Sequence, residues 1–452
     1  MYIKNQKFLV VGVSKSGCAV AEDLLKNNSE CYIYEQLKSE KISKNIDYLV
    51  SKGAILCTDE SVEQILSIVD AIVLSPGVPI NHQIAVKAKR QGVKILGELE
   101  YGYLRNLPTI VGITGTNGKT TTCSIISQIL NNAKIKNFLL GNVGQPLTSM
   151  IDEIDKDSVC VTEVSSFQLE SVYSFCPHIS CITNIAPDHL ERHYTMDNYI
   201  FLKKRIFKMQ RQSEYCILNY DDEVLKEVSK ECLAKIIWVS LKEKVDGGYL
   251  ENGVLYYKEE KIIEAEKLNL IGEHNLYNVL YSICVCKLLN VSTDVIAESL
   301  IKVRGVKHRI EKFAVIDNVE YYNDSKSTNV ASTLSALQSI KKPIVLILGG
   351  SEKGENYDNL FENIKLSTVK HVILTGASKF SMLDCAGKVG YTDVTVTPSF
   401  EYAVKISKMI ANDGEVVLLS PACSSFDNFT SYEERGEKFM SLVRDESEQS
   451  IK

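Results

Sequence analysis

The sequence predicts an α/β protein built from three domains. Its 452 residues are enough for about three domains of ordinary size. Short apolar strands alternate with helix-period segments, and glycine-rich or small polar turns follow several strands, as in parallel sheets that bind ligands. We therefore expect a Rossmann-like domain over residues 1–97, a P-loop ATPase-like domain over 98–303 and a second Rossmann-like domain over 304–452.

Composition argues against several classes of protein. The net charge is −6 without a long basic run, so we expect no nucleic-acid partner. No apolar stretch approaches the roughly 20 residues of a membrane span, and the N-terminus runs directly into a strand instead of a signal sequence. The thirteen cysteines are scattered without a C-x-x-C pair, which is typical of reduced thiols. We therefore expect a cytoplasmic protein.

The first segment has the rhythm of a dinucleotide-binding fold. A strand predicted at 8–13 runs into the turn 12–17, and a second strand at 31–34 ends at the acid Glu35. The turn has the spacing G-x-x-x-x-G instead of G-x-G-x-x-G, so we expect a nucleotide diphosphate other than NAD. Further strands are predicted at 71–74 and 93–96.

The stretch GITGTNGKTT, residues 112–121, carries the clearest chemical pattern. An apolar strand precedes it and a helix pattern follows, so backbone N–H groups at the helix N-terminus would bind phosphate. Lys119 would reach the terminal phosphates, and the hydroxyl of Thr120 would bind magnesium. Gly115 and Gly118 suit the turn because side chains would block the phosphates. The plain alternative is a glycine turn with a surface lysine.

A second apolar strand, predicted at 159–163, ends in the acid Glu163, 44 residues after Lys119. This is the arrangement of a Walker B element, whose carboxylate binds the magnesium of the nucleotide. In the last segment, each predicted strand ends in a small or polar loop, where ligands of parallel sheets bind. Those strands are predicted at 319–322, 344–348, 372–374 and 416–419.

Several separated motifs occur in an order that resembles the Mur ligase family, the ATP-dependent ligases of peptidoglycan precursor synthesis. The motifs are GTNGKTT, GNVG, EVSSFQLE, NIAPDHLERH, GEHNLYN, HRIE, NDSKSTN and LLSPACSSFDNF. The loop and DHLERH are shared across the family. The ending SPACSSFDNF-x-x-Y-x-x-RG is most similar to the branch that adds D-glutamate.

The resemblance implies an amide ligase that joins D-glutamate to UDP-N-acetylmuramoyl-L-alanine. ATP would phosphorylate the carboxylate, and the amine would then displace phosphate from the acyl phosphate. The implied cofactors are ATP and Mg²⁺, with Lys203 carrying a carbamate. The two small-molecule substrates are the implied partners, and we expect a monomer with no nucleic-acid or membrane partner.

The same resemblance assigns residues to sites. The catalytic set is Lys119, Glu163, His189, Lys203 and Asn142. The metal set is Thr120, Glu163, His189 and Lys203. The ATP set is Gly115, Thr116, Asn117, Gly118, Lys119, Thr120, Thr121, Asn275, Asn278, Arg309, Asp324 and Lys326. The set for the UDP substrate is Lys15, Ser16, Glu35, Gln36, Ser75, Gly77, Asn142, Ser165, Gln168 and His189. The D-glutamate set is Thr328, Lys353, Ser425 and Tyr432.

Four of these residues have plainer alternatives. Asn275 could be a helix N-cap, Arg309 a partner in a surface ion pair, and Lys353 a solvated loop lysine. Lys203 falls on the apolar face of a helix predicted over 199–209, where its ammonium could instead snorkel to the surface.

Glu35-Gln36-Leu37 stands where better-known members carry an Asp-Thr-Arg-like triplet, so we expect altered uracil contacts. Other functions also stay open. One is a neighbouring amide ligase that adds L-alanine, lysine or diaminopimelate, or that resembles folylpolyglutamate synthase. Another is a P-loop switch, although the chain has no N-K-x-D motif.

Overall fold

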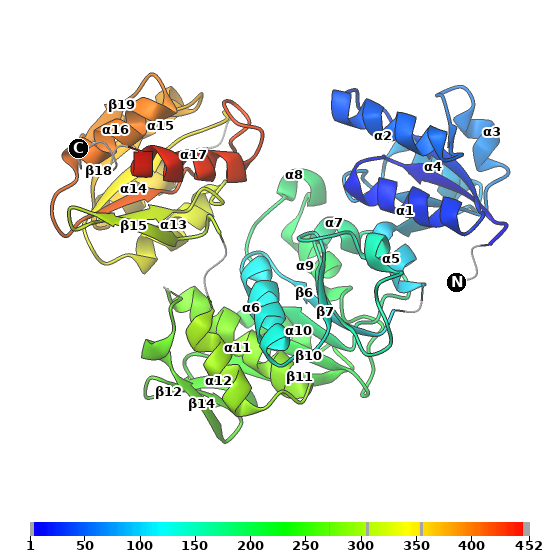
Figure 1. Cartoon of the computed structure of the whole chain (residues 1–452), viewed down its shortest axis with the longest axis horizontal. Coiled ribbons are helices and arrows are strands. Elements are labelled where there is room, and N and C mark those ends of the chain that lie inside the picture. Colours follow the sequence, from blue (N-terminus) through cyan, green and yellow to red (C-terminus); the bar gives the residue numbers. More distant parts are fainter. Residues whose placement is uncertain (1–3, 106, 271, 304–306, 353–355, 446–452) are drawn as a thin grey trace. The chain divides into compact units, whose positions relative to one another are not determined.

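A computed structural model describes residues 4–105, 107–270, 272–303, 307–352 and 356–445. Helices and strands alternate through three sheets, which confirms the predicted α/β class (Figure 1). The chain forms two compact units. The larger unit, residues 1–268 and 276–303, holds two sheets, and the smaller unit, residues 269–275 and the chain after Val303, holds the third.

The first sheet has five parallel strands in the order β3-β2-β1-β4-β5. They are β1 (Lys7–Val11), β2 (Glu30–Tyr34), β3 (Ile55–Leu56), β4 (Ala71–Leu74) and β5 (Lys94–Gly97). Phe8 and Val10 face one core while Leu9 and Val11 face the other, so the strands are apolar on both sides. One face packs against α1 (Lys15–Lys26), α2 (Glu40–Ser51) and α5 (Glu98–Tyr103). The other packs against α3 (Val62–Leu66) and α4 (Gln83–Arg90).

The second sheet has nine strands in the order β14-β13-β12-β11-β10-β9-β6-β8-β7. They are β6 (Thr109–Thr114), β7 (Asn137–Gly141), β8 (Val159–Glu163), β9 (Ile179–Ile182), β10 (Tyr215–Asn219), β11 (Lys235–Ser240), β12 (Gly247–Glu251), β13 (Val254–Tyr257) and β14 (Glu260–Glu264). The strands from β7 to β12 pair in parallel, and β13 and β14 extend the sheet antiparallel. Strand β6 lies between β8 and β9, so the strand order reverses there, and in open α/β sheets ligands bind at the carboxyl end of such a switch point.

The helices of this part of the chain follow its strands closely. They are α6 (Lys119–Asn132), η1 (Leu147–Met150), α7 (Ser166–Leu169), α8 (Leu190–His193), α9 (Met196–Lys204), α10 (Glu223–Ser229), η2 (Ala265–Lys267), α11 (Glu273–Leu288) and α12 (Thr293–Lys302). Helix α6 begins at the glycine turn after β6, which places its N-terminus at the carboxyl end of β6. The helix predicted over 199–209 is wrong in extent, because α9 starts earlier and ends at Lys204.

The third sheet has the order β15-β16-β20-β17-β18-β19, parallel except at β15. Its strands are β15 (Glu311–Ile316), β16 (Val319–Asn323), β17 (Ile344–Leu348), β18 (Val369–Leu374), β19 (Val394–Val396) and β20 (Val416–Leu419). One face packs against α13 (Val330–Ser339), α14 (Asp358–Leu366) and α15 (Lys379–Lys388). The other packs against α16 (Phe400–Ile410) and α17 (Tyr432–Asp445).

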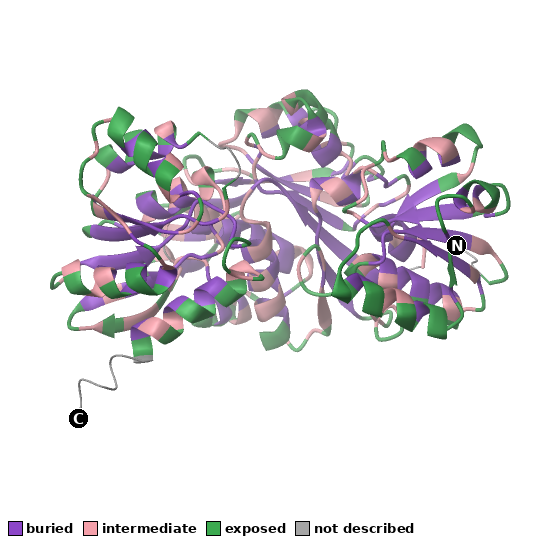
Figure 2. Ribbon diagram, turned by 90° about the horizontal axis from the view of Figure 1, so that it is seen from above, coloured by how far each residue is buried: buried purple, intermediate pink, exposed green. Residues whose placement is uncertain are grey.

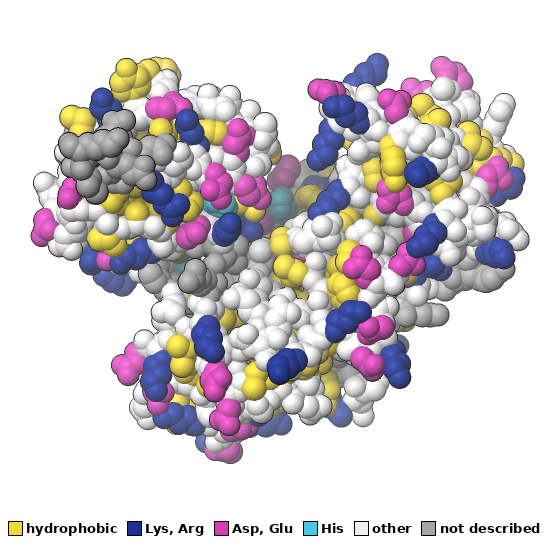
Figure 3. Space-filling model, viewed as in Figure 1, with side chains coloured by type: hydrophobic (Ala, Val, Ile, Leu, Met, Phe, Trp, Pro, Cys, Tyr) yellow, Lys and Arg dark blue, Asp and Glu magenta, His cyan; other side chains and the backbone are white. Residues whose placement is uncertain are grey.

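Burial follows the layered arrangement. Figure 2 shows buried residues concentrated on the strands and exposed residues on the outer helix faces. On the face drawn in Figure 3, side chains of both charge signs are interspersed, so no single-sign field covers it. Within the described ranges, no helix is long and apolar enough to cross a membrane.

Candidate functional site

The turn after β6 requires its two glycines. Gly115 has φ 139° and Gly118 has φ 85°, a backbone region that side chains disfavour. A Cβ at Gly115 would lie 2.0 Å from Thr183 Oγ1, and one at Gly118 would lie 2.4 Å from Asn278 Oδ1. The turn can therefore approach its neighbours, and a phosphate, only without side chains at these positions.

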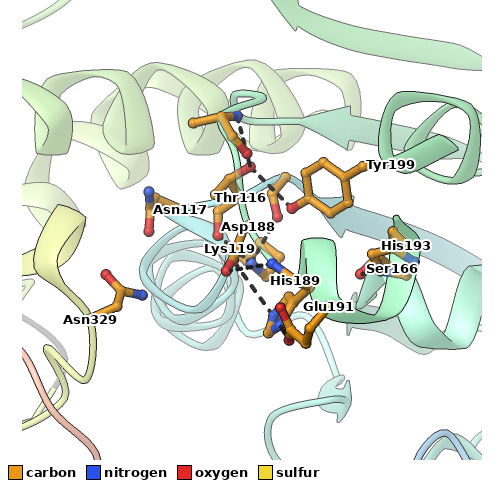
Figure 4. Close-up of polar contacts among 12 residues, drawn as sticks. Thr116, Asn117, Lys119, Ser166, Asp188, His189, Glu191, His193, Tyr199 and Asn329 are labelled. Carbon is orange, nitrogen blue, oxygen red and sulfur yellow. Dashed lines mark hydrogen bonds and ion pairs between the residues drawn. The ribbon is translucent and has the colours of Figure 1, made fainter. Parts of the chain in front are cut away.

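The segment after β9 holds this turn in place. The backbone N–H of Asn117 donates to Asn184 Oδ1 at 2.9 Å, and Asn184 Nδ2 donates back to Asn117 O at 3.1 Å. The hydroxyl of Thr116 donates to Ala186 O and lies 3.1 Å from the hydroxyl of Tyr199 (Figure 4). The geometry of the turn is thus fixed by the chain's own contacts.

The predicted Walker pair comes together at the carboxyl ends of two neighbouring strands. Glu163 ends β8 beside Ile113 of β6 and is buried. The Thr120 hydroxyl donates to Glu163 Oε2 at 2.8 Å, and Asn142 Nδ2 donates to Glu163 Oε1 at 2.8 Å. A carboxylate, a hydroxyl and an amide therefore meet at the start of α6.

Two lysines share one carbonyl of the turn. Lys119 Nζ donates to Gly115 O at 2.8 Å and to Thr116 O at 2.6 Å. Lys203 Nζ donates to Gly115 O at 2.8 Å and to Thr114 Oγ1 at 3.0 Å. Lys203 is 2% exposed, so the snorkelling alternative is wrong. Burial, and next the positive charge of Lys119, lower the pKa of Lys203 well below its usual value.

His189 lies at the start of α8 with φ 52° and an exposed ring. Its Nε2 is 3.6 Å from Asp188 Oδ2, and its Nδ1 is 3.5 Å from Glu191 Oε1 (Figure 4). The ring packs against Phe167, with 4.9 Å between centroids. The imidazole is thus presented to solvent between two carboxylates.

Ser165 and Gln168 have a structural role that the sequence analysis did not foresee. The Ser165 hydroxyl accepts the backbone N–H of Gln168 at 3.2 Å, and the Ser165 N–H donates to Gln168 Oε1 at 2.9 Å. This reciprocal capping box begins α7.

In the first sheet, the residues expected to bind UDP also organise their own loops. Glu35 accepts the backbone N–H groups of Val13 and Leu37, each at 2.8 Å. The Ser75 hydroxyl donates to Gly12 O at 2.7 Å. The turn after β1 is therefore tied both to the end of β2 and to the end of β4.

The amide of Gln36 is held between two neighbours. Its Nε2 donates to the Tyr34 hydroxyl at 2.7 Å, and its Oε1 lies 3.2 Å from His82 Nε2. Lys15 Nζ donates to Gly144 O at 2.5 Å, while Ser16 is half-buried. Leu37, which completes the triplet Glu35-Gln36-Leu37, is exposed.

In the smaller unit, Asp324 follows β16 and is 1% exposed. Its Oδ2 accepts the hydroxyls of Ser327 at 2.5 Å and Ser420 at 2.7 Å, and its Oδ1 accepts the N–H of Ile310. Burial raises its pKa from 3.8 to about 6 against these hydrogen bonds. Arg309 is half-buried, and among the described residues its Nε has no hydrogen-bond partner and the side chain makes no ion pair.

Asn275 lies inside the first turn of α11, so the N-cap alternative is wrong. Asn275 is 8% exposed and Asn278 is 4% exposed. Asn278 Oδ1 accepts the Thr122 hydroxyl at 3.3 Å.

Of the residues expected to bind D-glutamate, Ser425 is buried and Thr328 is half-buried. The centroid of the Tyr432 ring lies 5.5 Å from the ammonium of Lys326, a residue expected in the ATP set. Lys353 lies outside the described residues.

Sequence reasoning missed the structural role of Arg435. This 2% exposed guanidinium donates to Ser325 O at 2.9 Å and to Cys423 O at 3.0 Å. It therefore ties the NDSKSTN loop to the SPACSS loop. The R-G pair that closes the last motif was the available signal.

The turn after β6 and the end of β8 were expected to hold magnesium. Among the described residues, no group of three or more His, Cys, Asp or Glu side chains could hold a metal ion. The Thr120 hydroxyl and the Glu163 carboxylate nevertheless converge, and hard oxygen donors of this kind suit Mg²⁺ when phosphate and water complete its shell.

Comparison with known proteins agrees with this geometry. Residues 6–97 match the model of the Mur ligase MurD-like N-terminal domain, 113–286 the Mur ligase middle domain and 308–423 the Mur ligase glutamate ligase domain. The UDP-N-acetylmuramoylalanine–D-glutamate ligase of Clostridioides difficile strain 630 is 40% identical over 448 residues, covering 98% of this chain and 99% of that protein.

The chain belongs to the Mur ligase family.

Other relatives of this Mur ligase share its fold. The like-named ligase of Thermoanaerobacter sp. strain X514 is 40% identical over 450 residues, 98% of this chain and 99% of that protein. Among solved structures, UDP-N-acetylmuramate–alanine ligase of Thermotoga maritima covers 99% of this chain and 100% of its own, with 18% identity and a TM-score of 0.61. At that identity the structural likeness shows the three-domain Mur ligase fold alone.

Proposed function

We propose that this Mur ligase adds D-glutamate to UDP-N-acetylmuramoyl-L-alanine at the expense of ATP, in peptidoglycan precursor synthesis. The observation that carries the proposal is the 40% identity, over 98% of the chain, to proteins named for this reaction. The converging Thr120, Glu163 and Lys119 side chains support the ATP-dependent half of the chemistry.

The reaction joins two groups that do not combine on their own. The substrate carboxylate attacks the γ-phosphorus of ATP, and the bond to ADP breaks. The amine of D-glutamate then attacks the acyl carbon, phosphate leaves, and the amine loses a proton to give the amide. Anions meet in the first step, so the protein's main task is to place cations and N–H donors around them.

In this proposal the β- and γ-phosphates bind the N–H groups at the N-terminus of α6, which follows the turn 115–118, and Lys119 adds a positive charge. Thr120 and Glu163 would hold Mg²⁺, which supplies charge neutralisation on the phosphates when bound. His189 and a carbamylated Lys203 would serve a second ion beside the substrate carboxylate. Asn142 orients Glu163 through the 2.8 Å hydrogen bond.

The remaining assignments follow the family resemblance. Adenine would be bound by Asn275 and Asn278, phosphate by Arg309 and Lys326, and ribose by Asp324. D-Glutamate would be bound by Thr328, Lys353, Ser425 and Tyr432. The sugar nucleotide would be bound by Lys15, Ser16, Glu35, Gln36, Ser75, Gly77, Ser165, Gln168 and His189. We place the domain boundaries after residues 97 and 303.

A carbamate on Lys203 is supported by its position. The amine is 2% exposed and lies against Gly115 O and Thr114 Oγ1, beside the phosphate turn. Addition of CO₂ to the neutral amine forms an N–C bond and releases a proton, giving an oxygen anion suited to Mg²⁺. Labelling with ¹³C-bicarbonate should show a carbamate carbon by NMR in the wild type and none in Lys203→Met. Equal signals from both proteins would overturn this assignment.

One assay tests the function. The protein is incubated with ATP, Mg²⁺ and UDP-N-acetylmuramoyl-L-alanine while the amino acid is varied, and phosphate release is measured. D-Glutamate should be the amino acid that stimulates release. Stimulation by lysine or diaminopimelate instead, or by L-alanine when UDP-N-acetylmuramate replaces the nucleotide substrate, would identify a neighbouring ligase. ATP hydrolysis that needs no amino acid would favour a P-loop switch. We further propose that the protein is a cytoplasmic monomer. Light scattering measures the molar mass of the purified protein and so tests whether it is a monomer.

A further inference from the structure

A buried histidine joins two short helices beside the phosphate turn. His193 is 1% exposed, and its Nε2 lies 2.9 Å from the hydroxyl of Ser166, the first residue of α7 (Figure 4). Its Nδ1 faces Glu170 Oε1 at 3.7 Å. The carboxylate favours the proton on Nδ1, which leaves Nε2 to accept the Ser166 hydroxyl. One imidazole thus links α8 to both ends of α7.

Glu170 in turn holds the residue before His193. Arg192 donates to Glu170 through Nε at 2.8 Å and Nη2 at 2.6 Å, a two-pronged ion pair that is largely buried. The guanidinium also covers the Phe167 ring at 4.1 Å. Its Nη1 lies 3.4 Å from Gly77 O, in the loop that follows β4.

Helix α8 depends on these contacts because it is not stable alone. It is only four residues long, far below the length at which a helix is stable alone. The residues that flank it, His189 and Tyr194, have φ of 52° and 66°, a strained region for side-chain-bearing residues. Such a conformation persists only where surrounding contacts fix it.

The aromatic ring of Phe167 packs against both His193 and His189. Its centroid is 5.5 Å from the His193 ring and 4.9 Å from the His189 ring. The His193 ring also packs against Tyr199 at 5.5 Å, and the Tyr199 hydroxyl contacts Thr116 of the phosphate turn.

We propose that His193 is a positioning residue of the ligation site: bound to Ser166 and packed beside Glu170, it locks α8 so that His189 and Arg192 face the sugar-nucleotide substrate. The proposal rests on the function proposed above. Ser166 is not a nucleophile in this arrangement, because it is 3% exposed and no substrate can reach its hydroxyl.

The two substrates should respond differently to loss of this link. In this proposal His189 and Arg192 act on the sugar nucleotide, whereas the phosphate turn keeps its own anchors at Thr183 and Asn184 in addition to the Tyr199 hydroxyl. His193→Phe keeps the aromatic packing and removes both nitrogens. It should raise KM for UDP-N-acetylmuramoyl-L-alanine about tenfold, which corresponds to about 1.4 kcal/mol, and leave KM for ATP within about twofold.

Three further variants sharpen the test. His193→Gln, whose amide can reach the Nε2 position, should recover most of the wild-type KM. Ser166→Ala removes the partner with little change of volume and should reproduce the defect without adding to that of His193→Phe. His371→Phe is the matched control, because His371 Nε2 makes a similar 2.8 Å contact with a hydroxyl, that of Thr395, in the smaller unit. It should leave both KM values unchanged.

The experiment measures both KM values, kcat and the thermal unfolding midpoint of each variant in the D-glutamate-dependent assay. A lowered midpoint with unchanged KM values in His193→Phe and Ser166→Ala would make His193 a structural residue only and overturn the proposal. Equal increases in both KM values would also overturn it. A wild type without D-glutamate-dependent turnover would instead overturn the proposed function, so the two failures are distinct.

Discussion

Replacement of Glu163 by glutamine removes one charge from the candidate site with little change of shape. In the wild type, Glu163 Oε2 accepts the Thr120 hydroxyl and Oε1 accepts Asn142 Nδ2. In Glu163→Gln, the amide oxygen can keep facing Asn142, and the new amide N–H can donate to Thr120, because a hydroxyl rotates to accept. Both contacts are therefore re-formed without the negative charge.

The expected cost to stability is small compared with the cost to turnover. Exchanging two charge-assisted hydrogen bonds for neutral ones weakens them by about 2 kcal/mol together, and removal of a buried charge offsets part of this. A domain with about 5–15 kcal/mol of stability stays folded after such a loss. Loss of one preorganised electrostatic contact, in contrast, lowers kcat by about 10²–10³-fold.

Phosphate release in the presence of D-glutamate measures turnover, and urea unfolding measures stability. Glu98→Gln is the matched control: Glu98 is 1% exposed, and its Oε1 alone accepts both the N–H and the hydroxyl of Thr148 at 2.8 and 2.9 Å. It should turn over within about twofold of wild type, because its charge lies outside the phosphate site. A folded Glu163→Gln protein that keeps more than about a tenth of the wild-type kcat would refute the role assigned to the carboxylate. Its decrease in kcat would be smaller than the decrease expected from the loss of one electrostatic contact.

Three other outcomes are expected. Lys119→Ala should keep the fold and lower the rate at least ~10²-fold, because one positive charge is removed from the phosphate turn. Circular dichroism measures the fold and phosphate release measures the rate. A ligation rate within about tenfold of wild type would contradict this expectation. In the wild type the two oxygens of Glu35 accept the N–H groups of Val13 and Leu37. In Glu35→Gln one of these N–H groups faces the N–H of the new side-chain amide and loses its acceptor. KM for the sugar nucleotide should therefore rise while KM for ATP stays the same. The Asp324 carboxyl keeps its proton to a higher pH in the folded protein, about 6 against 3.8, so its contribution to stability should fall as pH rises across that window. Urea unfolding at several pH values should show the difference between wild type and Asp324→Asn shrinking by up to ~3 kcal/mol, and a constant difference would contradict the burial argument.

The strand, the glycine turn and the helix of the candidate phosphate site could be predicted from sequence because their determinants are local. A strand, a glycine turn and a helix are consecutive in the chain, and the two glycines are required by their own φ angles. Glu163 could be added because parallel strands end at one edge of a sheet, so an acid that ends β8 meets the turn that ends β6. The fold class followed from the same alternation of strands and helices.

The parts that could not be predicted depend on contacts between distant segments. Apolar residues at Ile206 and Phe207 continue the helix period, yet α9 ends at Lys204 and turns bury both side chains instead. The antiparallel strands β13 and β14 have only a short pattern, and they are fixed by the pairing of β13 with β12 and of β14 with β13. Roles such as that of Arg435, which crosses from one loop to another, appear only when both loops are placed.

The central claim is tested most directly by the mass of the product. The protein is given UDP-N-acetylmuramoyl-L-alanine, ATP and Mg²⁺ with an equimolar mixture of D-glutamate, L-glutamate, lysine and diaminopimelate, each carrying a distinct isotope label. Mass spectrometry should show a single ligated nucleotide that carries only the D-glutamate label, formed with one ADP per product. A product carrying any other label, or ADP formed without ligated nucleotide, would contradict the account.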